Sequence, residues 1–275
     1  NRSISTINFL SKKIKIHFIC LTFLSLIIPK ILFAQVQQGH TNQNKFRQLY
    51  VEFADPNNYR NASGAPGVDY YQQKVDYVMD IELDDKNSKL YGEEEITYTN
   101  NSPDNLTYLW LQLDQNIRKK DAPSLEKNSS GNSVTQRPSS FLKNYVNGSF
   151  NGGFNIEWVL DSQGNPLKYS INQTMMRVDL PETLSPNGIF KFKIKWWYNI
   201  NNRLEYGGRS GYETFENDGN KVYTIAQFFP RLCVYNDVEG WQNYQFWGNG
   251  EFALNFGDYD VKITVPDDHI MEATG

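Results

Sequence analysis

Residues 74–83 read KVDYVMDIEL and carry the strongest strand signal in the chain. Apolar side chains stand at every second position from Val75 to Leu83, and mostly charged side chains stand between them. This period of two is typical of a strand with one buried face. Turn residues follow at 84–88, and residues 90–99 return as a second strand. The stretch therefore predicts a β-hairpin.

The rest of the chain shows strand patterns and no sustained helical period. Residues 190–198 alternate large apolar side chains with lysines, and residues 108–113 form a nearly continuous apolar run, as expected of a strand covered on both faces. Further strands are expected at 154–160, 169–171, 175–180, 222–226 and 261–265. The polar segments 115–153 and 199–221 are expected to be surface loops. We therefore predict an all-β fold, a large antiparallel β-sandwich.

The composition excludes several classes of protein. The 275 residues hold 27 Lys plus Arg and 31 Asp plus Glu, a formal net charge of −4. A strongly basic nucleic-acid binder is excluded because neutralising phosphates requires clustered cations, so we expect no nucleic-acid partner. Two cysteines cannot build a disulfide framework. Three histidines leave little material for a histidine-based active site.

Residues 1–34 have the features of a leader. They hold five basic residues and no acidic one, an apolar run at 18–28, and a small residue, Ala34, that suits signal-peptidase cleavage. We interpret them as a secretory signal peptide. A single membrane anchor is the alternative, but the apolar run is shorter than the roughly 20 residues that spanning requires. Lipid attachment at Cys20 is a third option. We expect an exported protein, periplasmic or extracellular, without a stable membrane span after cleavage.

The remaining chain divides into an irregular lead-in at 35–70, rich in Gln, Asn and Gly, and one β domain at 71–275. Without the leader, 22 basic and 31 acidic side chains remain, a formal net charge of −9. Cys233 is then the only thiol, and we expect it to be a small buried apolar residue rather than a nucleophile.

Most motifs that carry enzymatic chemistry are absent from the sequence. It contains no H-E-x-x-H, no G-x-S-x-G, no P-loop and no Cys/His cluster. Residues 93–95 are three consecutive glutamates, which could suggest a cation site. We favour a solvated strand end, because Ca²⁺ loops use spaced carboxylates and carbonyls. His40 and His269 lie in no ligand motif, so we predict neither catalytic nor metal-binding residues in this chain.

Three stretches carry a resemblance to a known family. They are AQFFPR at 226–231 with VYND at 234–237, GEF at 250–252 with DYDVKITVP at 258–266, and the hairpin sequences YVMDIELD at 77–84 and GEEEITYTN at 92–100. These stretches resemble the N-terminal domain of the aminopeptidase-N family of zinc metallopeptidases, the gluzincins, and especially its exported bacterial branch. The resemblance covers roughly residues 70–275 and is interrupted by the variable region 115–215.

The resemblance implies a fold and an activity for the whole protein. Such enzymes pair an N-terminal β saddle with a thermolysin-like domain that bears H-E-x-x-H, a downstream Glu ligand and G-x-M-E-N, none of which occurs here. It implies that the chain is the N-terminal portion of a longer zinc metalloaminopeptidase and packs on its own C-terminal catalytic domain. That domain would hold the zinc, and this portion alone should be inactive. The substrate would be a peptide, cleaved near its N-terminus.

The resemblance also implies two substrate-binding residues. In the family, the segment that matches 226–229 reaches into the active site, where a Gln and a following acidic residue hold the N-terminal residue of the substrate. Gln227 matches the Gln, whereas Phe229 occupies the acidic position. A phenyl ring cannot replace the charge-assisted hydrogen bond of a carboxylate, but it offers a cation–π or hydrophobic surface. The alternative for Gln227 is a strand-end amide that caps a turn. For Arg231 we expect a structural ion pair or a domain-interface position rather than a catalytic role.

A function of another class remains open on the sequence. The chain could be a free-standing β-sandwich binding or adhesion module that uses tryptophans as a ligand platform. The candidates are Trp196, Trp197, Trp241 and Trp247. The alternating pattern, however, assigns many aromatic rings to the core first.

Overall fold

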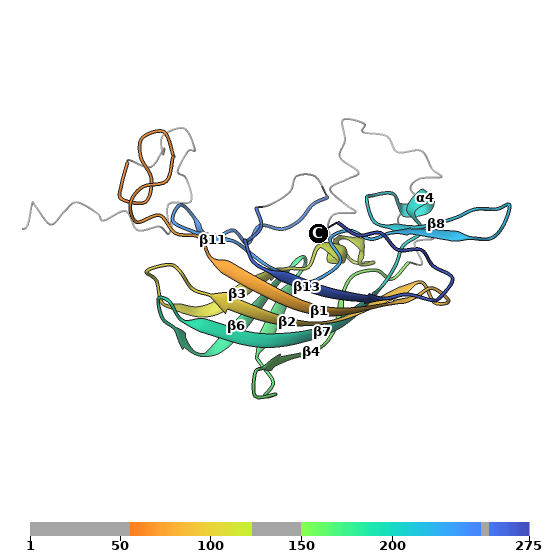
Figure 1. Ribbon diagram of the computed structural model, residues 1–275, viewed down its shortest axis with the longest axis horizontal. Coiled ribbons are helices and arrows are strands. Elements are labelled where there is room, and N and C mark those ends of the chain that lie inside the picture. The colour runs from red at the N-terminus through yellow and green to blue at the C-terminus, as the bar shows by residue number, and fades with distance from the viewer. Residues whose placement is uncertain (1–55, 123–149, 249–252, 275) are drawn as a thin grey trace, which may run out of the picture. The chain divides into compact units, whose positions relative to one another are not determined.

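Two β-sheets form the centre of the fold (Figure 1). The structure is a computed structural model that describes residues 56–122, 150–248 and 253–274. The described residues all lie in the compact unit Glu52–Gly275. The strands of the two sheets are β1 (Lys74–Asp84), β2 (Lys89–Thr99), β3 (Leu106–Gln112), β4 (Asn155–Asp161), β5 (Tyr169–Asn172), β6 (Met175–Leu184), β7 (Ile189–Asn199), β10 (Arg231–Leu232) and β13 (Tyr259–Thr264). One sheet has the order β13-β1-β2-β7-β4, and the other has the order β10-β3-β6-β5.

Smaller elements complete the described chain. They are the 3₁₀-helix η2 (Asp114–Arg118), the short helix α4 (Arg203–Tyr206), and the strands β8 (Gly211–Thr214), β9 (Lys221–Thr224), β11 (Tyr235–Asn236) and β12 (Gly240–Trp241). Strands β8 and β9 form one two-stranded sheet, and β11 and β12 form another.

The predicted hairpin at residues 74–99 is confirmed. Strands β1 and β2 pair antiparallel over eleven positions, with Val75 opposite Tyr98 and Leu83 opposite Leu90. Strand β7 pairs with the other side of β2 over another eleven positions. Because side chains alternate between the two faces of a strand, these registers bring the apolar positions of all three strands onto one face.

One edge of the five-stranded sheet departs from the antiparallel prediction. Strand β13 runs parallel to β1, with Tyr77 opposite Tyr259 and Ile81 opposite Ile263. A parallel pair requires a crossover connection, and here the chain leaves the four-stranded sheet after β10 before it reaches the edge of β1. The alternation at 261–265 predicted the strand but carries no information on its direction.

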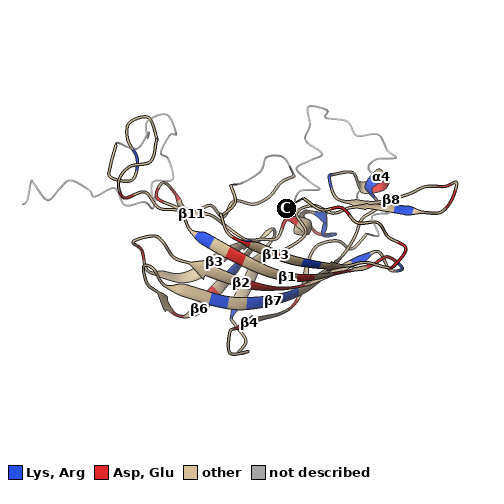
Figure 2. Ribbon diagram, in the orientation of Figure 1, with Lys and Arg blue, Asp and Glu red and all other residues tan. Residues whose placement is uncertain are grey.

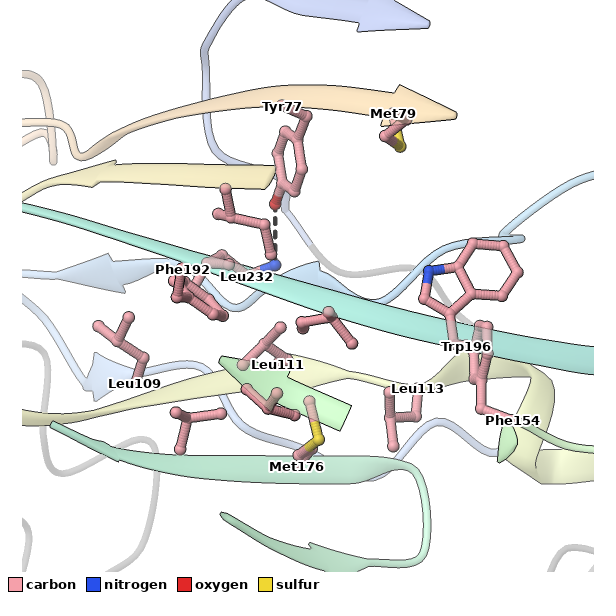
Figure 3. Close-up of a cluster of buried hydrophobic side chains, with 14 of the residues drawn as sticks. Tyr77, Met79, Leu109, Leu111, Leu113, Phe154, Met176, Phe192, Trp196 and Leu232 are labelled. Atoms are coloured by element: carbon pink, nitrogen blue, oxygen red, sulfur yellow. Dashed lines mark hydrogen bonds between the residues drawn. The ribbon is translucent and has the colours of Figure 1, made fainter. Parts of the chain in front are cut away.

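The hydrophobic core lies between the two main sheets. Leu109, Leu111 and Met176 come from the four-stranded sheet, and Phe192 and Trp196 come from the five-stranded sheet; all five are fully buried (Figure 3). Burying a large apolar side chain stabilises the fold by about 1.5–3 kcal/mol. The all-β sandwich-like fold is therefore confirmed, with antiparallel pairing everywhere in the two main sheets except at β13.

The indole of Trp196 occupies space that a glycine leaves open. Gly92 stands opposite Trp196 on the neighbouring strand. A Cβ atom at Gly92 would lie 2.2 Å from the Trp196 ring. Glycine at this position therefore lets the largest side chain of the core lie flat against β2.

The outer face of the five-stranded sheet carries the lysines of β7, visible as blue segments in Figure 2. Lys193 pairs with Glu95 at 3.2 Å, and Lys195 pairs with Glu157 at 3.5 Å. These side chains remain partly exposed, so each pair contributes little to stability. The alternation at 190–198 thus separates a core face from a solvated face, as predicted.

The interpretation of residues 93–95 as a solvated strand end is wrong for Glu94. The three glutamates lie in the middle of β2, where Glu94 points into the core with 0% exposure. Its two carboxylate oxygens have no hydrogen-bond partner among the described residues. Burial raises the pKa of Glu94 well above its usual value. Three consecutive identical residues hide the alternation that would have assigned one of them to the inner face.

Two segments expected to be loops contain regular structure. The segment 115–153 begins within η2, whose Asp114, Gln115 and Asn116 are at most 2% exposed. The segment 199–221 contains α4 and β8. These three elements are too short to show a period in the sequence. Residues 123–149 lie outside the described part of the chain.

The lead-in and the leader are described only in part. Arg60 donates two hydrogen bonds to the buried Asp237, at 2.7 Å and 2.8 Å, which ties the lead-in to the motif at 234–237. The predicted signal peptide at 1–34 lies outside the described residues, and so do its Cys20 and His17. His40 of the lead-in lies outside them too. Among the residues that the structure does describe, no helix combines the length and apolar character needed to cross a bilayer.

Candidate functional site

Residues 225–230 connect β9 to β10 and contain both predicted site residues. A side chain distant in the sequence fixes the backbone of this segment. Gln115 of η2 donates through Nε2 to the carbonyl of Ala226 at 3.0 Å and to that of Gln227 at 3.1 Å. Gln115 is itself 2% exposed and accepts a hydrogen bond from Arg118 Nη1 at 3.0 Å. The segment is therefore held by η2 rather than by sheet pairing.

The backbone of Gln227 adopts an uncommon conformation. Its φ of 52° lies in the left-handed region, which costs a non-glycine residue about 1–2 kcal/mol. Within the described residues its side-chain amide makes no hydrogen bond, so it caps no turn there. Ser88, Gln173 and Asn187 share this left-handed conformation.

Phe229 belongs to an aromatic cluster. Its ring meets Tyr77 at 5.4 Å and Phe228 at 5.1 Å between centroids, both edge to face. Tyr259 stacks on Tyr77 at 5.0 Å and also contacts Phe229 at 6.4 Å. Tyr259 is 48% exposed, so one side of the cluster meets solvent. Phe229 is thus a fixed, partly buried apolar wall beside Gln227.

Polar side chains under the cluster anchor the following strand. Arg231 forms an ion pair with Asp114 and donates to Gln112 Oε1 at 2.9 Å. The expected structural ion pair of Arg231 is therefore confirmed. The Tyr77 hydroxyl accepts a hydrogen bond from the backbone N–H of Leu232 at 3.0 Å (Figure 3). These bonds fix β10 against β3 and β1.

Cys233 follows this strand and is fully buried, as predicted. Burial raises the pKa of its thiol well above its usual value, so the reactive thiolate is disfavoured. Among the described residues, no group of three or more His, Cys, Asp or Glu side chains could hold a metal ion. His269 contacts its exposed neighbour Asp268 at 2.9 Å.

The four tryptophans of the alternative binding function lie in different environments. Trp196 is fully buried on the inner face of β7, whereas its neighbour Trp197 lies on the outer face beside Tyr91 and Lys89. Trp241 packs against Tyr98, and Trp247 lines a separate pocket. They do not form a common ligand platform.

Sequence reasoning did not identify Gln115 as part of the candidate site. It precedes Ala226 by 111 positions and Gln227 by 112, in a segment expected to be a surface loop. No local pattern signals a buried glutamine that binds two distant carbonyls, so only the tertiary structure could reveal it.

Comparison with known proteins yields only distant likenesses. No protein-family model matches the chain, and no curated protein matches it. Among solved structures, the M1 zinc metallopeptidase E323A mutant from Deinococcus radiodurans is similar over 74% of this chain and 34% of that chain, with 12% identity and a TM-score of 0.37. The same mutant bound to a Tyr-Ser-Ala substrate is similar over 71% and 33%, with 12% identity and a TM-score of 0.38. The chain spans about a third of the length of these proteins, and likeness at this distance assigns neither family nor function.

Proposed function

We propose that this chain is the N-terminal β domain of an exported zinc metallopeptidase of the aminopeptidase-N type, and that residues 226–229 form one wall of its substrate cleft. The observation that carries the proposal is the conformation of Gln227, which by sequence resemblance matches the family's substrate-binding glutamine. Its backbone is left-handed, and no described residue hydrogen-bonds to its side-chain amide. The sequence resemblance over residues 70–275 supports the same assignment.

The geometry suits a positioning role. A glutamine amide can donate and accept at once, so Gln227 can bind both the amino group and the first carbonyl of a peptide. Because Gln115 already holds the backbone, little conformational entropy is lost when a substrate binds. Zinc would belong to the catalytic domain of the whole protein, on which this domain would pack. Export to the periplasm or the cell exterior follows from the predicted leader.

Phe229 gives the proposed cleft an apolar character. Without a carboxylate at this position, the substrate's ammonium group loses a charge-assisted hydrogen bond. The aromatic cluster around Phe229 offers an apolar surface instead, and the faces of its rings attract a cation through their quadrupole. The proposed substrate is therefore a peptide whose first residue packs against aromatic rings.

The proposal is tested by assaying the full-length protein with leucine p-nitroanilide, with and without a chelator. We expect hydrolysis that the chelator abolishes and zinc restores, and no hydrolysis by the 275-residue chain alone. Activity that persists after metal removal would contradict the zinc metallopeptidase. Hydrolysis by the 275-residue chain would contradict the assignment of catalysis to a separate domain.

A further inference from the structure

A pocket of about 290 Å³ lies at the other end of η2 from Gln115, outside the candidate site. Three segments that are distant in the sequence surround it: η2 with the turn that follows, the turn between β5 and β6, and residues 246–247. The residues that carry the argument are Ile117, Lys119, Asp121, Ile171, Gln173 and Phe246.

Internal hydrogen bonds hold the pocket open. Asn116 donates to the carbonyl of Gln173 at 2.7 Å and accepts from the backbone N–H of Phe154 at 2.8 Å. Gln245 accepts from the hydroxyl of Thr174 at 2.7 Å and donates to the carbonyl of Asn172 at 2.9 Å. The bond between Asn116 and Phe154 is buried, whereas the bond from Gln245 to the carbonyl of Asn172 is exposed. The three segments are thus fixed to one another before any ligand binds.

The lining combines an apolar side with two opposite charges. Phe246 is 7% exposed, and Ile117 and Ile171 add aliphatic surface. Lys119 is half-buried, Asp121 is exposed, and neither forms an ion pair with the other or with another described residue. The side chain of Gln173, at a left-handed turn with φ 55°, is also exposed. The hydrogen-bonding groups of the frame are engaged, whereas these two charges remain available.

We propose that this pocket binds a small zwitterion, a free α-amino acid with an apolar side chain. The carboxylate of such a ligand pairs with Lys119, its ammonium pairs with Asp121, and its side chain packs against Phe246 and the two isoleucines. A ligand with a single charge can pair with Lys119 or with Asp121, but not with both. It therefore makes one charge-assisted hydrogen bond fewer than the zwitterion. The proposal does not depend on the peptidase assignment, because it uses none of residues 226–229.

Isothermal titration of the purified chain with L-leucine tests the proposal. N-acetyl-L-leucine and L-leucinamide, which each lack one charge, are the ligand controls. We expect saturable binding of L-leucine, and binding at least about tenfold weaker for each control, since each loses a charge-assisted hydrogen bond. Lys119→Met and Asp121→Asn should weaken the binding of L-leucine by a similar factor.

Lys120→Met is the matched control, because Lys120 is exposed next to Lys119 and does not line the pocket. Its affinity for L-leucine should equal that of the unmodified chain, and thermal melts should show that all three variants fold. The proposal is overturned if no saturable binding occurs up to about 10 mM L-leucine. It is equally overturned if L-leucinamide binds as well as L-leucine, or if Lys120→Met weakens binding as much as Lys119→Met.

Discussion

The centre of the five-stranded sheet and the segment 225–230 are held in place by different means. Strands β1, β2 and β7 pair over eleven residues each, and their inner side chains are almost all apolar and fully buried. The segment 225–230 has no ladder of its own and depends on hydrogen bonds from Gln115 and to Ser210 Oγ and on the aromatic cluster of Phe229. Repeated burial stabilises the first region, whereas individual contacts position the second.

The largest expected effect tests the role of burial in the sheet. Trp196→Ala should destabilise the protein by about 3–5 kcal/mol, because it removes the largest buried side chain and leaves a cavity beside Gly92. Trp197→Ala is the matched control on the outer face, where the ring contacts Tyr91 and Lys89, and should cost about 1 kcal/mol. Urea unfolding measures both, and equal losses would contradict the assignment of the two faces.

The next effect concerns the charge buried within that sheet. Because burial raises the pKa of Glu94 well above its usual value of 4.5, the folded protein binds this proton up to a higher pH than the unfolded chain does. The stability contributed by this difference is fully present below pH 4.5 and is lost as the pH rises toward the raised pKa, by up to about 1.4 kcal/mol per pH unit. Glu94→Gln should remove this loss, so the variant should be more stable than the unmodified protein at pH 7.

Glu95→Gln is the control for Glu94→Gln, because Glu95 lies on the outer face and pairs with Lys193. Its unfolding free energy, measured from pH 4 to pH 8 (about half a unit below to well above the usual glutamate pKa), should retain the pH dependence. If Glu94→Gln also retains it, Glu94 is ionised in the folded protein and the account of its burial is wrong.

The smallest effect on stability tests how the segment 225–230 is held. Gln115→Ala removes two hydrogen bonds to the carbonyls of Ala226 and Gln227 and should cost about 1–2 kcal/mol. Amide hydrogen exchange should become faster at 226–229 and stay unchanged in β2. Gln163→Ala, in an exposed turn, is the control. Unchanged exchange at 226–229 in Gln115→Ala would mean that Gln115 does not hold the segment, and that the aromatic cluster and the hydrogen bond from Ala226 N–H to Ser210 Oγ suffice.

The sequence predicted the repetitive region well and the other region poorly. The alternation at 74–83 and 190–198 predicted β1 and β7, because each strand buries one face along its whole length. The burial of Glu94 was not predicted, because a charged residue in a run of glutamates gives no sign of burial. The resemblance directed attention to Gln227 and Phe229, but the contacts of Gln115 and the cluster around Phe229 join residues far apart in the chain. Such contacts have no local period.

The proposed role of Gln227 is tested most directly by the kinetics of Gln227→Ala in the full-length protein. Alanine retains the β-carbon, so the left-handed backbone should be affected little, and the melting temperature should match that of Gln242→Ala, a control at another half-buried glutamine. We predict that kcat/KM for leucine p-nitroanilide falls by about 10- to 100-fold in Gln227→Ala, the loss of one or two hydrogen bonds to the substrate, and stays unchanged in Gln242→Ala. An unchanged kcat/KM in Gln227→Ala would remove residues 226–229 from the substrate cleft.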